Sequence, residues 1–170
     1  VAVTRFWLVR HGPTHARTMI GWTDLPADLS DSAALRRLSA HLPKHAPVIS
    51  SDLTRAMATA DALGPRPRLP HDPALREINF GQWETRPFAE IEAESPDHIR
   101  AFWDRPGDIA PPGGESWNAL SIRTWAALDR LQGLGTDWAA LGLLVVCVAL
   151  VYRFVPNVKV TFAEVWPGAI

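Results

Sequence analysis

The sequence predicts an α/β fold, because short runs typical of buried strands alternate with segments of helical spacing. Residues 6–9 are consecutive β-forming residues bounded on the far side by Gly12 and Pro13, and residues 47–50 are expected to form a short second strand. Between them, Asp31 is expected to cap a helix over Ser32–His41, where apolar residues recur at helical spacing. The length of 170 residues suits a single domain with a sizeable core.

Further elements follow the second strand. The sequence turns helical directly after Ser51-Asp52, through Ala56 and Ala60 to Leu63. Beyond it we expect a third strand at 68–69, a charged and aromatic loop at 75–84, and helices at 88–94, 97–104 and 116–131, the last capped by Ser116.

Composition narrows the classes of function. The net charge of −1 favours neither nucleic acid nor an anionic membrane as a partner. Cys147 is the sole cysteine, so no intramolecular disulfide can form, which fits a reducing compartment. No secretory signal is predicted at the start of the sequence. We therefore expect a cytoplasmic location.

An uncharged run covers residues 138–152. It is shorter than the roughly 17–25 apolar residues that a membrane-spanning helix needs. The favoured interpretation is a buried strand with flanking core residues, and the alternative is an apolar helix. Membrane association through 138–155 is thus open but not favoured.

Two junctions carry residues suited to binding an anion. The first strand ends in Arg10-His11-Gly12, which places an arginine and a histidine at the carboxyl edge of the sheet, where open α/β folds bind ligands. The glycine lets the backbone approach a ligand, and an imidazole can attack a bound phosphoryl group. The second strand leads through Ser51-Asp52 into a helix whose first turn contains Arg55, and helix N-termini attract anions. Alternatively, Arg55 is an ordinary charge at a helix start.

Four motifs stand in one order along the chain. They are Arg10-His11-Gly12, Ser51-Asp52-Leu53-Thr54-Arg55-Ala56, Arg76-Glu77 with Gly81-Gln82-Trp83-Glu84, and Pro112-Gly113-Gly114-Glu115-Ser116. In order and spacing the chain resembles the histidine phosphatase superfamily, phosphoglycerate mutase-like branch, over about residues 4–131. This resemblance implies a mostly parallel sheet flanked by helices on both faces.

The resemblance also implies roles for single residues. His11 would be the nucleophile that forms a phosphohistidine, and Arg10 and Arg55 would clamp the phosphate oxygens through their guanidinium forks. Glu77 would act as general acid and then as general base. No metal or other cofactor is implied, since the arginines supply the charge stabilisation. Thr14 and the turn at 113–116 would border the pocket.

Several nearby residues compete for these roles or lie outside them. Glu84, Glu90 and Glu92 are close to Glu77 in sequence and are alternatives to it. The remaining histidines lack metal-ligand spacing and are predicted to be surface or capping residues: His15, His41, His45, His71 and His98. The expected partner is a small phosphorylated metabolite. The short interval between 83 and 113 favours a phosphatase over a glycolytic mutase.

The C-terminal part departs from the family pattern. The family carries a second histidine at a late strand end, whereas this chain has no histidine after His98 and places Val148 at the matching position. The loss of one such donor typically costs about 10²–10³-fold in rate. Residues 152–160 and 166–169 resemble a segment of the YihY/BrkB-like membrane protein family. We therefore expect a phosphatase domain at 1–131 and an atypical apolar tail at 132–170, and either an active phosphomonoesterase or a phosphate-binding derivative with impaired catalysis.

Overall fold

A computed structural model describes residues 5–133 and 143–146. Three strands of the described residues form one parallel sheet in the order β1-β3-β2. They are β1 (Phe6–Val9), β2 (Val48–Ser50) and β3 (Leu143–Val146). Val9 and Ser50 both lie opposite Val146, so the carboxyl ends of the strands meet at one edge of the sheet.

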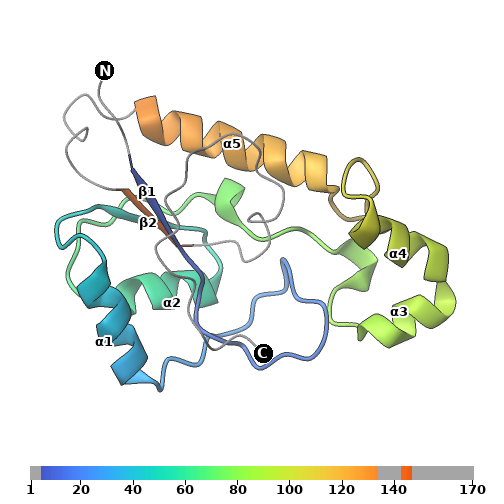
Figure 1. Ribbon diagram of the computed structural model, residues 1–170, viewed down its shortest axis with the longest axis horizontal. Coiled ribbons are helices and arrows are strands. Elements are labelled where there is room, and N and C mark those ends of the chain that lie inside the picture. The colour runs from blue at the N-terminus through green and yellow to red at the C-terminus, as the bar shows by residue number, and fades with distance from the viewer. Residues whose placement is uncertain (1–4, 134–142, 147–170) are drawn as a thin grey trace.

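Helices cover both faces of this sheet, as predicted (Figure 1). They are α1 (Ser32–His41) and α2 (Thr54–Ala62) on one side and α5 (Trp117–Gly133) on the other. Side chains alternate along β1: Phe6 and Leu8 pack in a cluster with Ala127 of α5, whereas Val9 packs with Ala60 of α2. The alternation follows from the two-residue period of a strand.

A second core lies beyond the sheet, beside α3 (Phe88–Glu94) and α4 (Pro96–Asp104). It is rich in aromatic rings: Phe102 of α4 stacks on Trp117 at 5.5 Å between centroids and meets Trp83 edge-on at the same distance. Trp83 belongs to a 3-10 turn, η2 (Gly81–Trp83). The aromatic packing thereby fixes the loop that leads from Glu77 to Glu84.

Most predicted elements are confirmed, and one is wrong. The helix over Ser32–His41 has Asp31 as its cap, and Ser116 caps α5 by accepting from the backbone N–H of Ala119 at 3.1 Å. Arg68-Leu69 does not form a strand and makes only an isolated bridge to Val48. The physical reason is the surrounding prolines at 65, 67 and 70, which lack the N–H groups that a ladder requires.

The apolar run at 138–152 is described only at 143–146, where the predicted strand is confirmed as β3. The rest of the run, with Cys147 and Val148, lies outside the described residues, as does the whole of 147–170. No helix of the described residues is both long enough and apolar enough to span a bilayer.

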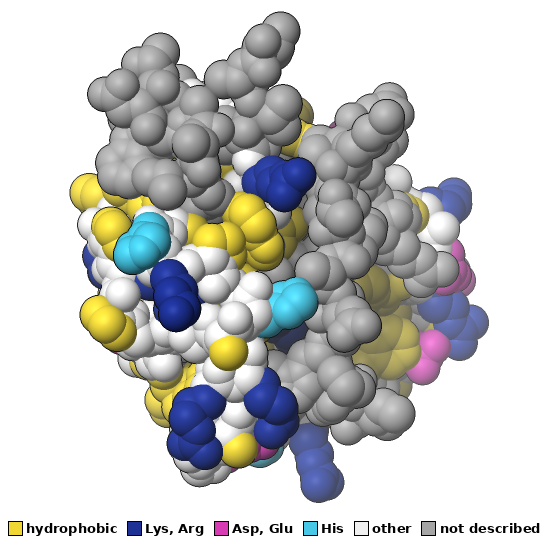
Figure 2. Space-filling view, turned by 60° about the vertical axis from the view of Figure 1, so that its left-hand side comes forward, with side chains coloured by type: hydrophobic (Ala, Val, Ile, Leu, Met, Phe, Trp, Pro, Cys, Tyr) yellow, Lys and Arg dark blue, Asp and Glu magenta, His cyan; other side chains and the backbone are white. Residues whose placement is uncertain are grey.

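Figure 2 shows one face of the molecule, on which the Lys and Arg side chains of the described residues are spread unevenly, with several of them close together at its lower end.

Candidate active site

Three segments bring a histidine, an arginine and a glutamate together at the carboxyl edge of the sheet. His11 follows β1, Arg55 lies in the first turn of α2, and Glu77 follows a 3-10 turn, η1 (Pro73–Leu75). His11 Nε2 lies 3.2 Å from Arg55 Nε and 3.8 Å from Glu77 Oε2. Arg55 Nη2 lies 3.4 Å from the same Glu77 oxygen. The structure thus brings together three of the four residues predicted for catalysis within hydrogen-bonding or near-contact distance.

These three side chains line one wall of a cavity of about 240 Å³. Arg55 is buried, with 1% of its side chain exposed, while His11 and Glu77 keep 11% and 13%. The other residues that line the cavity are Arg10, Thr14, Ala16, Thr18, Met19, Ile20, Phe80 and Trp103. Arg10, the fourth predicted residue, is exposed at this cavity and has no hydrogen-bond or ion-pair partner among the described residues. Its guanidinium is therefore available to an anion in the cavity.

The hydrogen bonds of the His11 ring select one tautomer. Nδ1 lies 2.7 Å from the carbonyl oxygen of Gly12, which can only accept, so Nδ1 carries the hydrogen. Nε2 faces the Nε–H of Arg55 and accepts from it. In the neutral ring, Nε2 therefore carries the lone pair, directed towards Arg55 and the cavity wall.

The loop that carries His11 is tied to α2. The backbone N–H of Gly12 donates to Thr59 Oγ1 at 2.9 Å, and the Thr59 hydroxyl donates to the carbonyl of Arg55 at 2.7 Å. A side chain at Gly12 would also clash, because a Cβ there would lie 2.9 Å from the carbonyl oxygen of Asp28. Thr59, which is buried, thus links the histidine and the arginine through the backbone.

Arg55 is held from behind by two carbonyl groups. Its Nη2 donates to the Gly21 carbonyl at 2.5 Å and its Nη1 to the Thr23 carbonyl at 2.9 Å. The turn comes close to the neighbouring loop, since a Cβ on Gly21 would lie 1.9 Å from the carbonyl oxygen of Ile78. Nothing in the sequence of this turn marks its contact with Arg55.

Arg123 on α5 holds the segment that presents Glu77. Its Nη2 donates to the Glu77 carbonyl and its Nη1 to the Arg76 carbonyl, both at 2.8 Å. It also pairs with Glu115 at 2.6 Å, and Glu115 accepts from the N–H of Asn79. The turn at 113–116 was expected to border the pocket, but none of its residues lines the cavity. Its Glu115 instead supports the Glu77 segment through Arg123 and the N–H of Asn79.

The N-terminus of α2 is not open to an anion in the way the sequence suggested. Asp24 occupies it, accepting from the backbone N–H of Thr54 at 2.8 Å and from its hydroxyl at 2.6 Å. A neighbouring carboxylate, Asp52, pairs with Arg76, whose hydrogen bonds hold the pKa of Asp52 below its usual value. Anion binding at this edge therefore depends on the arginine side chains.

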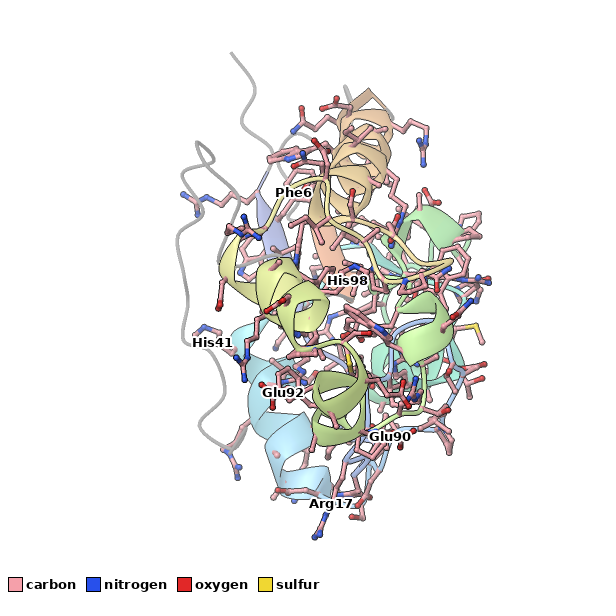
Figure 3. The ribbon with its side chains drawn as sticks, turned by 90° about the vertical axis from the view of Figure 1, so that its right-hand side faces the viewer. Phe6, Arg17, His41, Glu90, Glu92 and His98 are labelled. Carbon is pink, nitrogen blue, oxygen red and sulfur yellow. The ribbon has the colours of Figure 1, made fainter. Side chains whose placement is uncertain are left out.

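The competing glutamates and histidines lie elsewhere. Glu90 and Glu92 extend from α3 and pair with Arg86 and Arg100 (Figure 3). Four of the other histidines are exposed, as predicted, whereas His98 is half-buried and its ring packs edge-on against Trp83. His15 meets Asp28, His71 meets Ser50, His98 meets the Ala110 carbonyl, and His41 and His45 are exposed. Among residues 5–133 and 143–146, no three His, Cys, Asp or Glu side chains form a group that could hold a metal ion.

Comparison with known families decides the relationship. The model of the histidine phosphatase superfamily, branch 1, matches residues 6–155. The chain belongs to the histidine phosphatase superfamily. The match extends past residue 131, where the resemblance was expected to end, and no comparison supports a likeness of the tail to the YihY/BrkB-like family.

Curated relatives within the superfamily carry phosphatase names. The chain is 36% identical over 149 residues to the glucosyl-3-phosphoglycerate phosphatase of Mycolicibacterium vanbaalenii, covering 82% of the chain and 65% of the relative. It is 31% identical to the adenosylcobalamin/alpha-ribazole phosphatase of Salmonella typhimurium, covering 75% of the chain and 67% of the relative. The chain thus spans about two thirds of the length of these relatives.

Solved structures of the superfamily share the fold. Bacillus stearothermophilus YhfR superposes with a TM-score of 0.78 at 28% identity, covering 89% of the chain and 77% of that structure. A phosphoglycerate mutase from Thermus thermophilus gives 0.63 at 36% identity, covering 83% and 75%. The predicted phosphoglycerate mutase-like α/β architecture is therefore confirmed for the superposed part of the chain.

Proposed function

We propose that the chain is a metal-independent phosphomonoester hydrolase that acts through a phosphohistidine on His11. The observation that carries the proposal is the cluster of His11 Nε2 with Arg55 and Glu77 at one cavity wall, within 3.8 Å of one another. The tautomer set by Gly12 leaves the lone pair on Nε2, the atom that would attack phosphorus. The phosphatase names of the relatives support the same reaction class.

The reaction would proceed in two transfers. In the first, the hydrogen bond from Arg55 Nε to His11 Nε2 breaks, Nε2 forms a bond to phosphorus while the bond to the leaving oxygen breaks, and Glu77 gives that oxygen a proton. In the second, Glu77 takes a proton from water, whose oxygen attacks phosphorus as the P–N bond breaks and inorganic phosphate leaves. Arg10 and Arg55 would neutralise the charge on the phosphoryl oxygens in both steps, as guanidinium forks do.

Replacing Glu77 with glutamine tests the acid role. We expect hydrolysis of an alkyl phosphate, whose alkoxide needs a proton to leave, to fall by about 10²–10⁴-fold. Formation of the phosphoenzyme from p-nitrophenyl phosphate should fall far less, because p-nitrophenolate leaves unaided. The measurement is a rapid-quench comparison of the two substrates. Equal losses for both substrates would contradict the assignment of Glu77 as the acid.

The substrate is proposed to be a small phosphorylated metabolite. Beyond the phosphate-binding residues, the cavity offers apolar side chains from Met19, Ile20, Phe80 and Trp103 beside the hydroxyls of Thr14 and Thr18. Such a wall suits a leaving group with both apolar and hydroxyl surface. The compounds to test first are sugar phosphates, glucosyl-3-phosphoglycerate and alpha-ribazole phosphate, the last two taken from the names of the relatives.

A second candidate is a phosphate-binding derivative with impaired catalysis. It is favoured by the absence of a histidine after His98, at the position where the family carries its second one. Calorimetric titration with inorganic phosphate separates the two candidates when combined with a turnover assay. Binding without turnover supports the derivative, and turnover lost in a His11→Ala variant supports the enzyme. The boundary between a domain at 1–131 and a tail at 132–170 stays a prediction, as does a cytoplasmic location.

A further inference from the structure

We infer that Glu84 is a positioning residue for Arg55, acting through the turn at 21–23. This inference rests on the proposed function, since it concerns how the phosphate-binding arginine is aimed. Glu84 does not line the cavity, and its place in the sequence suggests only an alternative to Glu77. The contacts of its carboxylate give it a different role.

The carboxylate of Glu84 accepts five hydrogen bonds. Oε2 receives the N–H groups of Gly21 and Thr23, each at 3.1 Å, and the Thr23 hydroxyl at 2.6 Å. Oε1 receives the N–H groups of Trp22 at 2.7 Å and of Phe80 at 3.1 Å. Burial alone would raise the pKa of Glu84, but the bonds from Thr23 and the backbone outweigh burial and lower it. The group is therefore held as a carboxylate.

One peptide group connects this carboxylate with the catalytic arginine. The peptide between Gly21 and Trp22 donates its N–H to Glu84 at 2.7 Å, while its carbonyl accepts from Arg55 Nη2 at 2.5 Å. In a planar trans peptide the N–H and the carbonyl point in opposite directions, so this peptide bridges the Glu84 carboxylate and the Arg55 guanidinium. Each hydrogen bond polarises the other in the same sense, which strengthens both. The orientation of this peptide therefore depends on Glu84, and so does one of the two carbonyl groups that accept hydrogen bonds from the Arg55 guanidinium.

The second carbonyl acceptor of Arg55, that of Thr23, depends on the same carboxylate. Thr23 gives Glu84 its N–H and its hydroxyl, and its carbonyl accepts from Arg55 Nη1 at 2.9 Å. Both carbonyls behind Arg55 thus come from residues that Glu84 holds. Gly21 already lies too close to Ile78 for any side chain, so the turn has little room to find another arrangement.

The position of Glu84 is itself fixed by backbone pairing. The neighbouring Thr85 donates its N–H to the Met19 carbonyl at 2.7 Å, and Met19 donates to the Arg86 carbonyl at 3.0 Å. Thr85 has a φ of +64°, a region that residues with side chains rarely adopt. The strand-like pairing at Met19 holds this strained residue in place. Glu84 is therefore presented to the turn from a fixed backbone.

The test is Glu84→Gln, with Glu90→Gln as the matched control. An amide keeps the shape of the carboxylate but sets its NH₂ against backbone N–H groups that now lack an acceptor, so the turn should shift. We expect kcat/KM for p-nitrophenyl phosphate to fall at least about tenfold, because small misplacements of a clamping group are costly. Glu90 is exposed and pairs with Arg86, so its variant should match the unchanged chain.

A second readout follows Arg55 directly and needs no turnover. The readout is the rate at which the Nε–H of Arg55 exchanges with solvent, measured by NMR on ¹⁵N-arginine-labelled protein. We expect this exchange to be slow in the parent chain, because the Nε–H is buried and donates a hydrogen bond to His11. Glu84→Gln should speed that exchange at least about tenfold relative to Glu90→Gln. Faster exchange together with reduced kcat/KM supports the inference.

Two outcomes would overturn the inference about Glu84, and a third would contradict the proposed function. Unchanged exchange of the Arg55 Nε–H in the folded Glu84→Gln variant would overturn the inference whatever the activity. Faster exchange with unchanged kcat/KM would show that Glu84 orders the turn without serving the reaction, and would overturn it as well. A parent chain that turns over no phosphomonoester would instead contradict the proposed function, while the exchange comparison would still decide whether Glu84 positions Arg55.

Discussion

Replacing His11 with alanine is expected to lower phosphomonoester hydrolysis by at least about 10³-fold, the scale on which other enzymes lose activity when their nucleophile is removed. The reason is that Nε2, which faces Arg55 at 3.2 Å and Glu77 at 3.8 Å, is the atom proposed to bond to phosphorus. The measurement is the rate of p-nitrophenyl phosphate hydrolysis in EDTA. The chelator should leave the rate of the parent chain unchanged.

A matched histidine serves as the control for this prediction. His71 is exposed and hydrogen-bonds Ser50 at 3.0 Å, and it does not line the cavity. His71→Ala should therefore keep the parent rate within about threefold, as surface substitutions usually do. A His11→Ala variant that hydrolyses the substrate as fast as His71→Ala would refute the assignment of the nucleophile.

Replacing Arg55 with alanine should have the second-largest effect. It removes the buried cation beside His11, and we expect kcat to fall by about 10²–10³-fold, the usual cost of losing a preorganised charge-stabilising group. Phosphate affinity should fall with it. Arg55→Lys should recover only a small part of both, because an ammonium group cannot reproduce the fork that reaches Gly21 and Thr23. Steady-state kinetics and calorimetry with inorganic phosphate measure the two effects.

Loss of Arg55 also leaves two carbonyl groups unpaired, so a control must separate misfolding from catalysis. Arg66 offers one, since it likewise donates to backbone carbonyls, those of Ser39 and Leu63, but away from the cavity. Arg66→Ala should lower the thermal midpoint while leaving kcat within about threefold. If Arg55→Ala loses no more activity than Arg66→Ala, the clamp assignment fails.

The sequence predicted the parts of the site that sit at strand ends. His11 lies just beyond the end of β1, and Arg55 lies in the first turn of α2, the helix that follows β2. Parallel strands deliver such residues to a single edge, so their proximity could be foreseen. Glu77 is different, because no strand precedes it directly within the described residues. Only the family resemblance predicted that Glu77 belongs to the site. The structure shows that Arg123 and the aromatic core hold the segment that contains it.

The supporting contacts could not be predicted, since they join residues far apart in sequence. Glu84 binds a turn more than sixty positions before it, and Arg123 binds carbonyls from 74 to 77. Nothing local in either sequence segment marks these contacts, because any backbone offers N–H and carbonyl groups. The predicted strand at 68–69 is wrong for a local reason, because the prolines at 65, 67 and 70 lack the N–H groups that a ladder requires.

The most direct test of the central claim is to detect the phosphohistidine itself. Because Glu77 is proposed to activate the water that cleaves the P–N bond, Glu77→Gln should accumulate the phosphoenzyme after mixing with p-nitrophenyl phosphate. Alkaline quenching and mass spectrometry should then find one phosphoryl group on the peptide that contains His11, and brief acid treatment should remove it. A His11→Ala, Glu77→Gln double variant should carry none. Turnover by the parent chain with no phosphoryl group on His11, or with one on another residue, would contradict the account.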